Sequence, residues 1–287
     1  MKHILNIIAF IICSMFIQSC ETDITVDLPN PEQRIVVEGI LEPGKLVSVF
    51  LSYNAAFFAP LDTNELLKYT VKNAIVIVND GVKIDTMKEA LPGIGYIYVS
   101  NGMIGTIGRT YNLTVIADGK TVTARTTIPP PIALDSVWFR LQEFTDTLGF
   151  AWGHLTDPDT LGNNYRWLAR RIGKDKDFVA PIGSVFEDKF INGKSFDFGY
   201  NRGKSINSEA EDDKNEEEGF FKVGDTIIVK FCTMDREHFE FWRTAETQIS
   251  NNGNFFGSPS TIKTNVKGGL GIWGAYSPTF DTIIATK

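Results

Sequence analysis

The feature that most constrains the fold is a series of short segments in which apolar and polar residues alternate, separated by turn signals. The clearest pair, Thr110–Ile116 and Lys120–Thr126, flanks Ala117-Asp118-Gly119. Asp-Gly between two alternating segments is a strong signal for a β-hairpin. Further strands are predicted at Ile35–Leu41, Val47–Tyr53, Ala74–Val78 and Gly95–Val99. About seven short strands with such turns predict a β-sandwich of immunoglobulin-like or transthyretin-like type.

A proline run marks the predicted boundary between two domains. Ile128-Pro129-Pro130-Pro131-Ile132 contains three consecutive prolines, which cannot join a sheet ladder and favour a stiff extended segment. The predicted domains are therefore a β-sandwich over residues 33–128 and a second β-rich domain over residues 129–287. Strands in the second domain are predicted at Asp135–Arg140, Leu148–Trp152, Asn164–Arg171 and Val223–Cys232.

One segment of the second domain has helical rather than alternating periodicity. Apolar residues at spacings of three and four predict an amphipathic helix over Arg236–Ser250. Asp235 occupies the position of an N-cap. Packed on a sheet, the helix is expected to bury Phe239, Trp242 and Ile249. The predicted fold class is thus mostly β, with one amphipathic helix in the second domain.

The start of the chain has the composition of an export signal. Lys2 precedes an apolar run, Ile4–Ile17, which is shorter than the ~20 residues that a membrane-spanning helix needs. Ile17-Gln18-Ser19-Cys20 resembles a bacterial lipobox. It predicts a signal peptide over residues 1–19 and lipid, including palmitate, on Cys20. The alternative is an ordinary cleaved signal followed by an unrelated cysteine.

A lipid on Cys20 places the protein in the cell envelope. Two or more acyl chains hold a protein firmly at a bilayer, so the rest of the chain needs no membrane-spanning segment. The polar, proline-containing residues 20–32 are expected to act as a tether. The predicted localisation is lipid-anchored at the outer membrane, on its periplasmic or its surface face.

The charge balance and the cysteines exclude two classes of protein. With 28 Lys and Arg against 35 Asp and Glu, the net charge is −7, which argues against nucleic acid as a partner. Cys13 leaves with the signal and Cys20 is the lipid site. Cys232 is then the remaining cysteine, so no intrachain disulfide is expected. Within its apolar segment, Cys232 is interpreted as a small buried hydrophobe.

Several motifs along the chain point to a family. Val37-Glu38-Gly39 follows the tether, the proline run divides the chain, and Asn254-Phe255-Phe256 follows the helix. Gly268-Gly269-Leu270-Gly271 and Gly274-Ala275-Tyr276-Ser277 precede a final strand. From lipobox to C-terminus the chain resembles the bacterial lipoprotein family catalogued as domain of unknown function 4249. The resemblance implies a gene beside a TonB-dependent receptor. It implies no activity and no catalytic residues.

The glycines near the C-terminus also match a nucleotide-binding pattern. Residues 269–274 satisfy Gly-x-Gly-x-x-Gly, but a dinucleotide site needs a strand before the motif and a helix after it. Neither is predicted here, so no cofactor is expected. The preferred interpretation is a backbone bend at which aromatic side chains pack over glycine.

Candidate catalytic and metal-binding residues are sparse. The sequence contains no His-Glu-x-x-His of zinc proteases, no Gly-x-Ser-x-Gly of serine hydrolases and no Ser-x-x-Lys with the partner motifs of β-lactamases. Of the histidines after the signal, His154 and His238, the latter is expected at the surface or in a cap. The acidic run 209–218 is interpreted as a solvated loop, because the spacing of a calcium-binding loop is absent. Binding of a cation by its carboxylates stays open. No catalytic, cofactor or metal residue is therefore assigned.

Large aromatic residues are frequent in the second half of the chain. They can form platforms that bind sugars or peptides, or they can fill the core, and the core is the preferred interpretation. The residues concerned are Trp138, Trp152, Trp167, Tyr200, Trp242, Trp273 and Tyr276.

Together these features predict a non-enzymatic, lipid-anchored accessory protein. We expect it to work with a TonB-dependent receptor in nutrient capture, with a ligand that the sequence does not name. The alternatives are a structural or adhesive surface lipoprotein and, third, a metal-dependent hydrolase.

Overall fold

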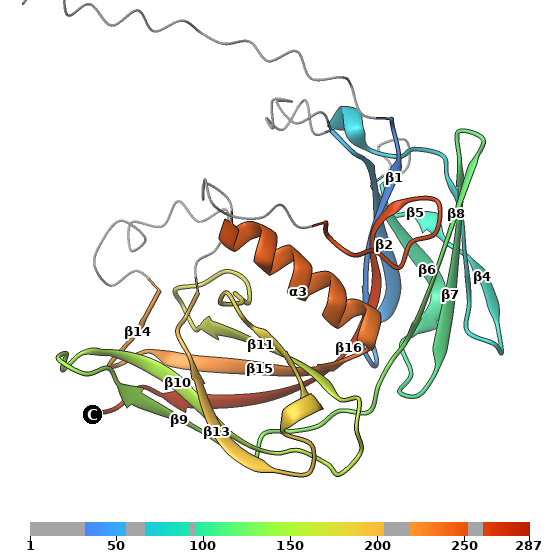
Figure 1. Cartoon of the computed structure of the whole chain (residues 1–287). Helices are drawn as coiled ribbons and strands as arrows, with labels where there is room; N and C mark the ends of the chain where they lie inside the picture. Colours follow the sequence, from blue (N-terminus) through green and yellow to red (C-terminus); the bar gives the residue numbers. More distant parts are fainter. Residues whose placement is uncertain (1–31, 56–66, 92–95, 204–218, 252–260) are drawn as a thin grey trace, which may run out of the picture. The chain divides into compact units, whose positions relative to one another are not determined.

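The computed structural model describes residues 32–55, 67–91, 96–203, 219–251 and 261–287. Contacts divide the chain into two units, Met1–Glu32 and Gln33–Lys287. All described elements belong to the second unit. The described residues form sixteen strands and one α-helix, which confirms the predicted mostly β class (Figure 1).

The first half of this unit supplies the strands of a β-sandwich. One sheet contains β1, β2, β5 and β6, and the other has the order β4-β3-β7-β8. The bounds are β1 Ile35–Leu41, β2 Leu46–Tyr53, β3 Ile75–Asn79, β4 Ile84–Thr86, β5 Lys88–Glu89, β6 Ile97–Ile104, β7 Thr110–Ala117 and β8 Lys120–Thr127, with a 3-10 turn at Leu67–Tyr69.

The turn residues and the alternation explain why this sandwich forms. The predicted hairpin around Asp118 is confirmed: β7 and β8 pair antiparallel, and Asp118 and Gly119 have φ of 49° and 72°. Positive φ at both central residues suits the right-handed twist of the strands. Val37, Val49 and Val115 alternate with exposed or half-exposed neighbours and lie fully buried between the sheets.

The second half supplies another pair of packed sheets. Strands β9, β10, β13 and β14 form one sheet, and β11, β12 and β15 lie in the other. Trp167 and Phe231 are fully buried in the core that they share. The bounds are β9 Ser136–Leu141, β10 Leu148–Thr156, β11 Asn164–Arg171, β12 Val185–Glu187, β13 Ser195–Tyr200, β14 Phe221–Lys222 and β15 Thr226–Met234, with a 3-10 turn at Asp188–Phe190.

The last strand, β16 (Leu270–Ile284), belongs to both halves. Its first part pairs parallel with β1, and its second part pairs antiparallel with β15 (Figure 1). The resulting eight-stranded sheet has the order β12-β11-β15-β16-β1-β2-β6-β5. Trp273 and Ala275 of this strand lie in the core of the first sandwich. The proposed division at residues 128 and 129 separates most of the two cores but leaves this strand in both.

The predicted helix is present as α3, Arg236–Asn251. Asp235 caps it, because its Oδ1 accepts a hydrogen bond of 2.8 Å from the backbone N–H of His238. Phe239 is buried as predicted, and Trp242 packs partly buried in the same cluster. Ile249, however, is 46% exposed, so its predicted burial is wrong. The buried side of the helix ends one turn earlier, at Glu246.

Candidate functional site

Two residue sets singled out in the sequence lie outside the described residues. Cys20, the predicted lipid site, belongs to the first unit together with the signal peptide and most of the tether. The acidic run 209–218 also lies outside them. Among the described residues, no group of three or more His, Cys, Asp and Glu side chains could hold a metal ion.

The prediction that His238 lies at the surface is wrong, because its side chain is fully buried. The residue takes part in the cap only through its backbone N–H, which donates to Asp235. Nδ1 lies 3.2 Å from the backbone oxygen of Ala275, and Nε2 accepts a hydrogen bond of 2.9 Å from Trp242 Nε1. This arrangement fits a neutral ring that carries its proton on Nδ1. Burial, with the nearby charge of Arg166, lowers the pKa of His238 to about 3.

The expected close approach at the C-terminal glycines is confirmed. A Cβ on Gly271, where φ is +91°, would lie 2.0 Å from the backbone oxygen of Val37. A Cβ on Gly274 would lie 2.4 Å from the ring of His238. Glycine therefore lets β16 pack tightly against β1 on one side and an aromatic ring on the other.

A buried polar network fastens α3 to the sheet beneath it. The carboxylate of Glu246 accepts hydrogen bonds from Ser184 Oγ at 2.5 Å and from the backbone N–H groups of Gly183 and Ser184 at 2.9 and 3.1 Å. The guanidinium of Arg166 lies 3.5 Å from the ring centroid of Trp242 and donates to Tyr276 Oη. These partners all come from the chain itself, so the network has a structural explanation.

The thiol of Cys232 is fully buried beside the same polar network. Burial raises the pKa of its thiol to about 12, which keeps it protonated at neutral pH. The prediction that Cys232 acts as a small buried hydrophobe is confirmed.

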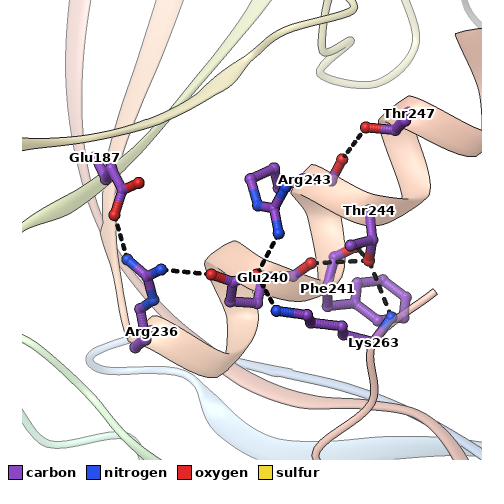
Figure 2. Close-up of polar contacts among 8 residues, drawn as sticks. All are labelled: Glu187, Arg236, Glu240, Phe241, Arg243, Thr244, Thr247 and Lys263. Atoms are coloured by element: carbon purple, nitrogen blue, oxygen red, sulfur yellow. Dashed lines mark hydrogen bonds and ion pairs between the residues drawn. The ribbon is translucent and has the colours of Figure 1, made fainter. Parts of the chain in front are cut away.

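The outward side of α3 carries paired charges. Figure 2 shows Glu240 between Arg236, Arg243 and Lys263, with nitrogen–oxygen distances of 2.5, 2.7 and 2.8 Å. Arg236 also pairs with Glu187. Burial alone would raise the pKa of Glu240, but the hydrogen bonds and charges of these three basic groups lower it to about 2. The cluster fixes the segment at Lys263 to the helix.

The aromatic residues divide into two groups, which the sequence alone did not separate. Trp167, Trp273 and Tyr276 are buried, as the preferred interpretation expected. Trp138 and Trp152 instead lie opposite each other on the outward side of the β9–β10 pair. On β10 the inward positions include Ala151 and Leu155, which are fully buried, and the tryptophan occupies the alternate position.

We define the aromatic face as the outward side chains of β9, β10 and β13: Trp138, Arg140, Phe150, Trp152, His154 and Asp197. The ring centroids of Trp138 and Trp152 are 6.3 Å apart, with an interplanar angle of 23°. The guanidinium of Arg140 lies 5.3 Å from the Trp152 centroid. His154 Nδ1 lies 2.5 Å from Asp197 Oδ1, and both side chains are at least one-third exposed.

A glycine determines how the Trp152 ring lies. Gly199 of β13 pairs with Trp152, and a Cβ added there would lie 2.6 Å from the ring. The ring thus rests over the backbone of β13 at a position without a side chain. Trp152 Nε1 is buried and has no hydrogen-bond partner among the described residues, so part of the indole is covered.

The sequence alone did not identify the polar members of this face as a site, although one signal was present. Within β10, the small residues Gly149, Ala151 and Gly153 alternate with Phe150, Trp152 and His154. This alternation indicates that the large residues share one side of the strand, although it does not specify which side faces the core. The partners Arg140 and Asp197 require the pairing of β9 and β13 with β10, which no local pattern specifies.

The comparisons with known proteins add a family but no activity. No curated protein matches the chain significantly. Among solved structures, a two fibronectin type-III domain segment from chicken tenascin matches with 12% identity and a TM-score of 0.24, over 89% of this chain and 99% of that one.

Within the described ranges, no helix has the length and apolar character needed to cross a bilayer. A family model matches residues 21–281, nearly the whole chain after Cys20. The chain therefore belongs to the family described as Domain of unknown function (DUF4249).

Proposed function

We propose that this protein is a lipid-anchored, non-enzymatic binding protein of the outer membrane, which assists a TonB-dependent receptor in nutrient capture. The observation that carries the binding role is the aromatic face. Trp138 and Trp152 keep only part of their surface buried and lie next to charged side chains on one sheet. Partly exposed aromatic side chains next to polar and charged groups are typical of interaction sites.

The anchoring part of the proposal is supported by the sequence. Ile17-Gln18-Ser19-Cys20 resembles a lipobox, and the family match begins one residue after Cys20. Mass spectrometry of the N-terminal peptide is expected to find acyl chains on Cys20. Cys20→Ser is expected to move the chain from the membrane fraction to the soluble fraction, and its retention in the membrane fraction would contradict the anchor.

The receptor partnership is tested by co-purification from outer membranes solubilised in a mild detergent. We expect a TonB-dependent receptor to be recovered with the wild-type chain. Phe280→Ala is the control variant and is expected to recover the receptor as well, because Phe280 is a 55% exposed aromatic on β16, in a different sheet from the aromatic face. Recovery of no receptor from native membranes would refute the partnership and would favour a structural or adhesive surface protein.

A further inference from the structure

We propose that the aromatic face binds a neutral glycan, with a sugar ring stacked on Trp138 or Trp152 and its hydroxyl groups at His154 and Asp197. This inference rests on the proposed binding role and adds the chemical class of the ligand. A pyranose ring has an apolar face of C–H groups and a rim of hydroxyls that both donate and accept hydrogen bonds. The aromatic face combines a flat apolar surface with donors and acceptors beside it.

The register of the strands places these groups in adjacent rows. The row Trp138–Trp152–Gly199 runs across β9, β10 and β13, and the next outward row is Ser136–His154–Asp197. Neighbouring strands lie about 4.8 Å apart, so each row extends over about 10 Å. The rows are long enough for two linked sugar rings, with the apolar row under the rings and the polar row at their edge.

The polar row offers both kinds of hydrogen-bonding group. The contact between His154 and Asp197 uses Nδ1 of the ring and Oδ1 of the carboxylate. His154 Nε2 and Asp197 Oδ2 make no hydrogen bond to other described residues, and both side chains are accessible to solvent. Thr156 and Ser195 extend the row with a hydroxyl pair, 2.9 Å apart.

The strand arrangement disfavours an extended peptide as the ligand. Peptides commonly add to a free sheet edge through backbone hydrogen bonds. At Trp152, β10 is paired on both sides, with β9 and with β13. Only side chains are therefore available at the centre of this face.

The charges on the face favour a neutral ligand. The guanidinium of Arg140 lies over the Trp152 ring, 5.3 Å from its centroid, and Asp197 lies one row away. The positive and negative groups balance locally, and the chain as a whole carries a net charge of −7. Neither feature provides the concentrated positive field that a nucleic acid or a strongly anionic polymer needs.

The test measures binding of defined probes to the full chain in detergent micelles. The probes are cellotetraose, maltotetraose, chitotetraose and mannotetraose, with tetra-alanine as the peptide probe, followed by titration calorimetry. We expect at least one tetrasaccharide to bind saturably with a Kd of about 1 mM or tighter. Trp152→Ala is expected to weaken that binding at least about tenfold, because stacking on an aromatic ring is lost.

Two further variants make the test decisive. Asp197→Asn removes charge without changing side-chain size and is expected to weaken binding severalfold, so it replaces Trp152→Ala if that variant does not fold. Phe280→Ala is expected to bind as the wild type does. Circular dichroism establishes that each variant is folded. Equal affinity of the folded aromatic-face variants and the control would overturn the proposal.

The outcomes also separate this inference from the proposed function. If no tetrasaccharide binds while the receptor still co-purifies, the glycan assignment is wrong and the accessory role stands. Binding of tetra-alanine in place of the sugars likewise overturns the glycan assignment. If a tetrasaccharide binds but no receptor is recovered, the ligand class stands and the receptor partnership fails.

Discussion

Each sandwich contains a tryptophan ring packed on a glycine of a neighbouring strand, but the two pairs lie in different surroundings. In the first sandwich a Cβ on Gly39 would lie 2.4 Å from the ring of Trp273, and in the second a Cβ on Gly199 would lie 2.6 Å from that of Trp152. Trp273 is fully buried, and its Nε1 donates to the backbone oxygen of Tyr111 at 3.1 Å. Trp152 lies on an outward sheet face.

The comparison shows that the same local contact serves two purposes. In both pairs, the missing side chain of glycine lets the indole lie against a strand. Where a second sheet covers the ring, as with Trp273, the contact closes a core and the N–H finds a partner in that sheet. Where no strand covers the ring, as with Trp152, the contact holds an aromatic surface in a fixed orientation. Substitutions in the two pairs should therefore separate stability from binding.

The largest effect is expected for Trp273→Ala. Removing a fully buried indole leaves a cavity between the two sheets and costs about 3–5 kcal/mol in the free energy of unfolding. Trp152 is partly rather than fully buried, so Trp152→Ala is expected to cost less, about 1–3 kcal/mol. Urea unfolding followed by circular dichroism checks both values. Equal losses of unfolding free energy in the two variants would show that Trp152 contributes to the core as much as Trp273 does.

Gly39→Ala is expected to have the next largest effect. The new Cβ would overlap the Trp273 ring, which is enclosed between two sheets and has no free direction in which to move. Overpacking of this kind costs about 1–3 kcal/mol. The measurement is again the urea midpoint, and an unchanged midpoint would mean that the ring can shift within the core.

A third ring on a glycine, His238 over Gly274, makes the stability depend on pH. The folded protein keeps this buried ring neutral down to about pH 3, whereas the unfolded chain binds a proton near pH 6.5. The unfolded state therefore takes up more protons between these values. The contribution of His238 to the free energy of unfolding falls as pH falls through this window, by at most about 1.4 kcal/mol per pH unit.

The titration of Asp235 changes the stability with pH in the opposite direction. A variant is therefore needed to isolate the contribution of His238. Burial raises the pKa of Asp235 to about 6, which favours the folded state at low pH and is lost as pH rises through 6. His238→Asn removes the histidine term and keeps a polar side chain. We expect the wild-type stability minus that of the variant to decrease from pH 7 to pH 4. A constant difference over that range would contradict the neutral ring.

The smallest effect on stability is expected for Gly199→Ala. Its Cβ would meet the Trp152 ring, but the ring can turn toward solvent, so the cost is below about 1 kcal/mol. The orientation of the ring changes nonetheless, and we expect tetrasaccharide binding to weaken several-fold. A variant that loses as much stability as Gly39→Ala, or that binds like the wild type, would remove the distinction between the two pairs.

Local sequence patterns predicted the strands and the helix better than they predicted which strands pair with each other. The alternation in β1, β2 and β7, the Asp118 turn and the Asp235 cap depend on neighbours in the sequence, and each is present in the structure. The pairing of β1 with β16 joins residues more than 230 positions apart, so no local pattern specifies it.

The candidate site also depends on contacts between residues that are distant in the sequence. His238 is buried because its ring packs against Gly274 and Tyr276 of β16, which lies far from the helix in the sequence. Trp138 lies on the outward side of its sheet and Trp273 on the buried side of another, a difference that the amino-acid composition does not reveal. The sequence could identify aromatic residues and strands. It could not identify which rings a second sheet would cover.

The shared strand β16 has a consequence for biosynthesis. Most of the first sandwich is translated early, yet Trp273 and Ala275 of its core emerge from the ribosome near the end of synthesis. Contacts between such distant residues form slowly, because a long loop must close first. The nascent chain therefore cannot complete its first core until nearly the whole polypeptide exists.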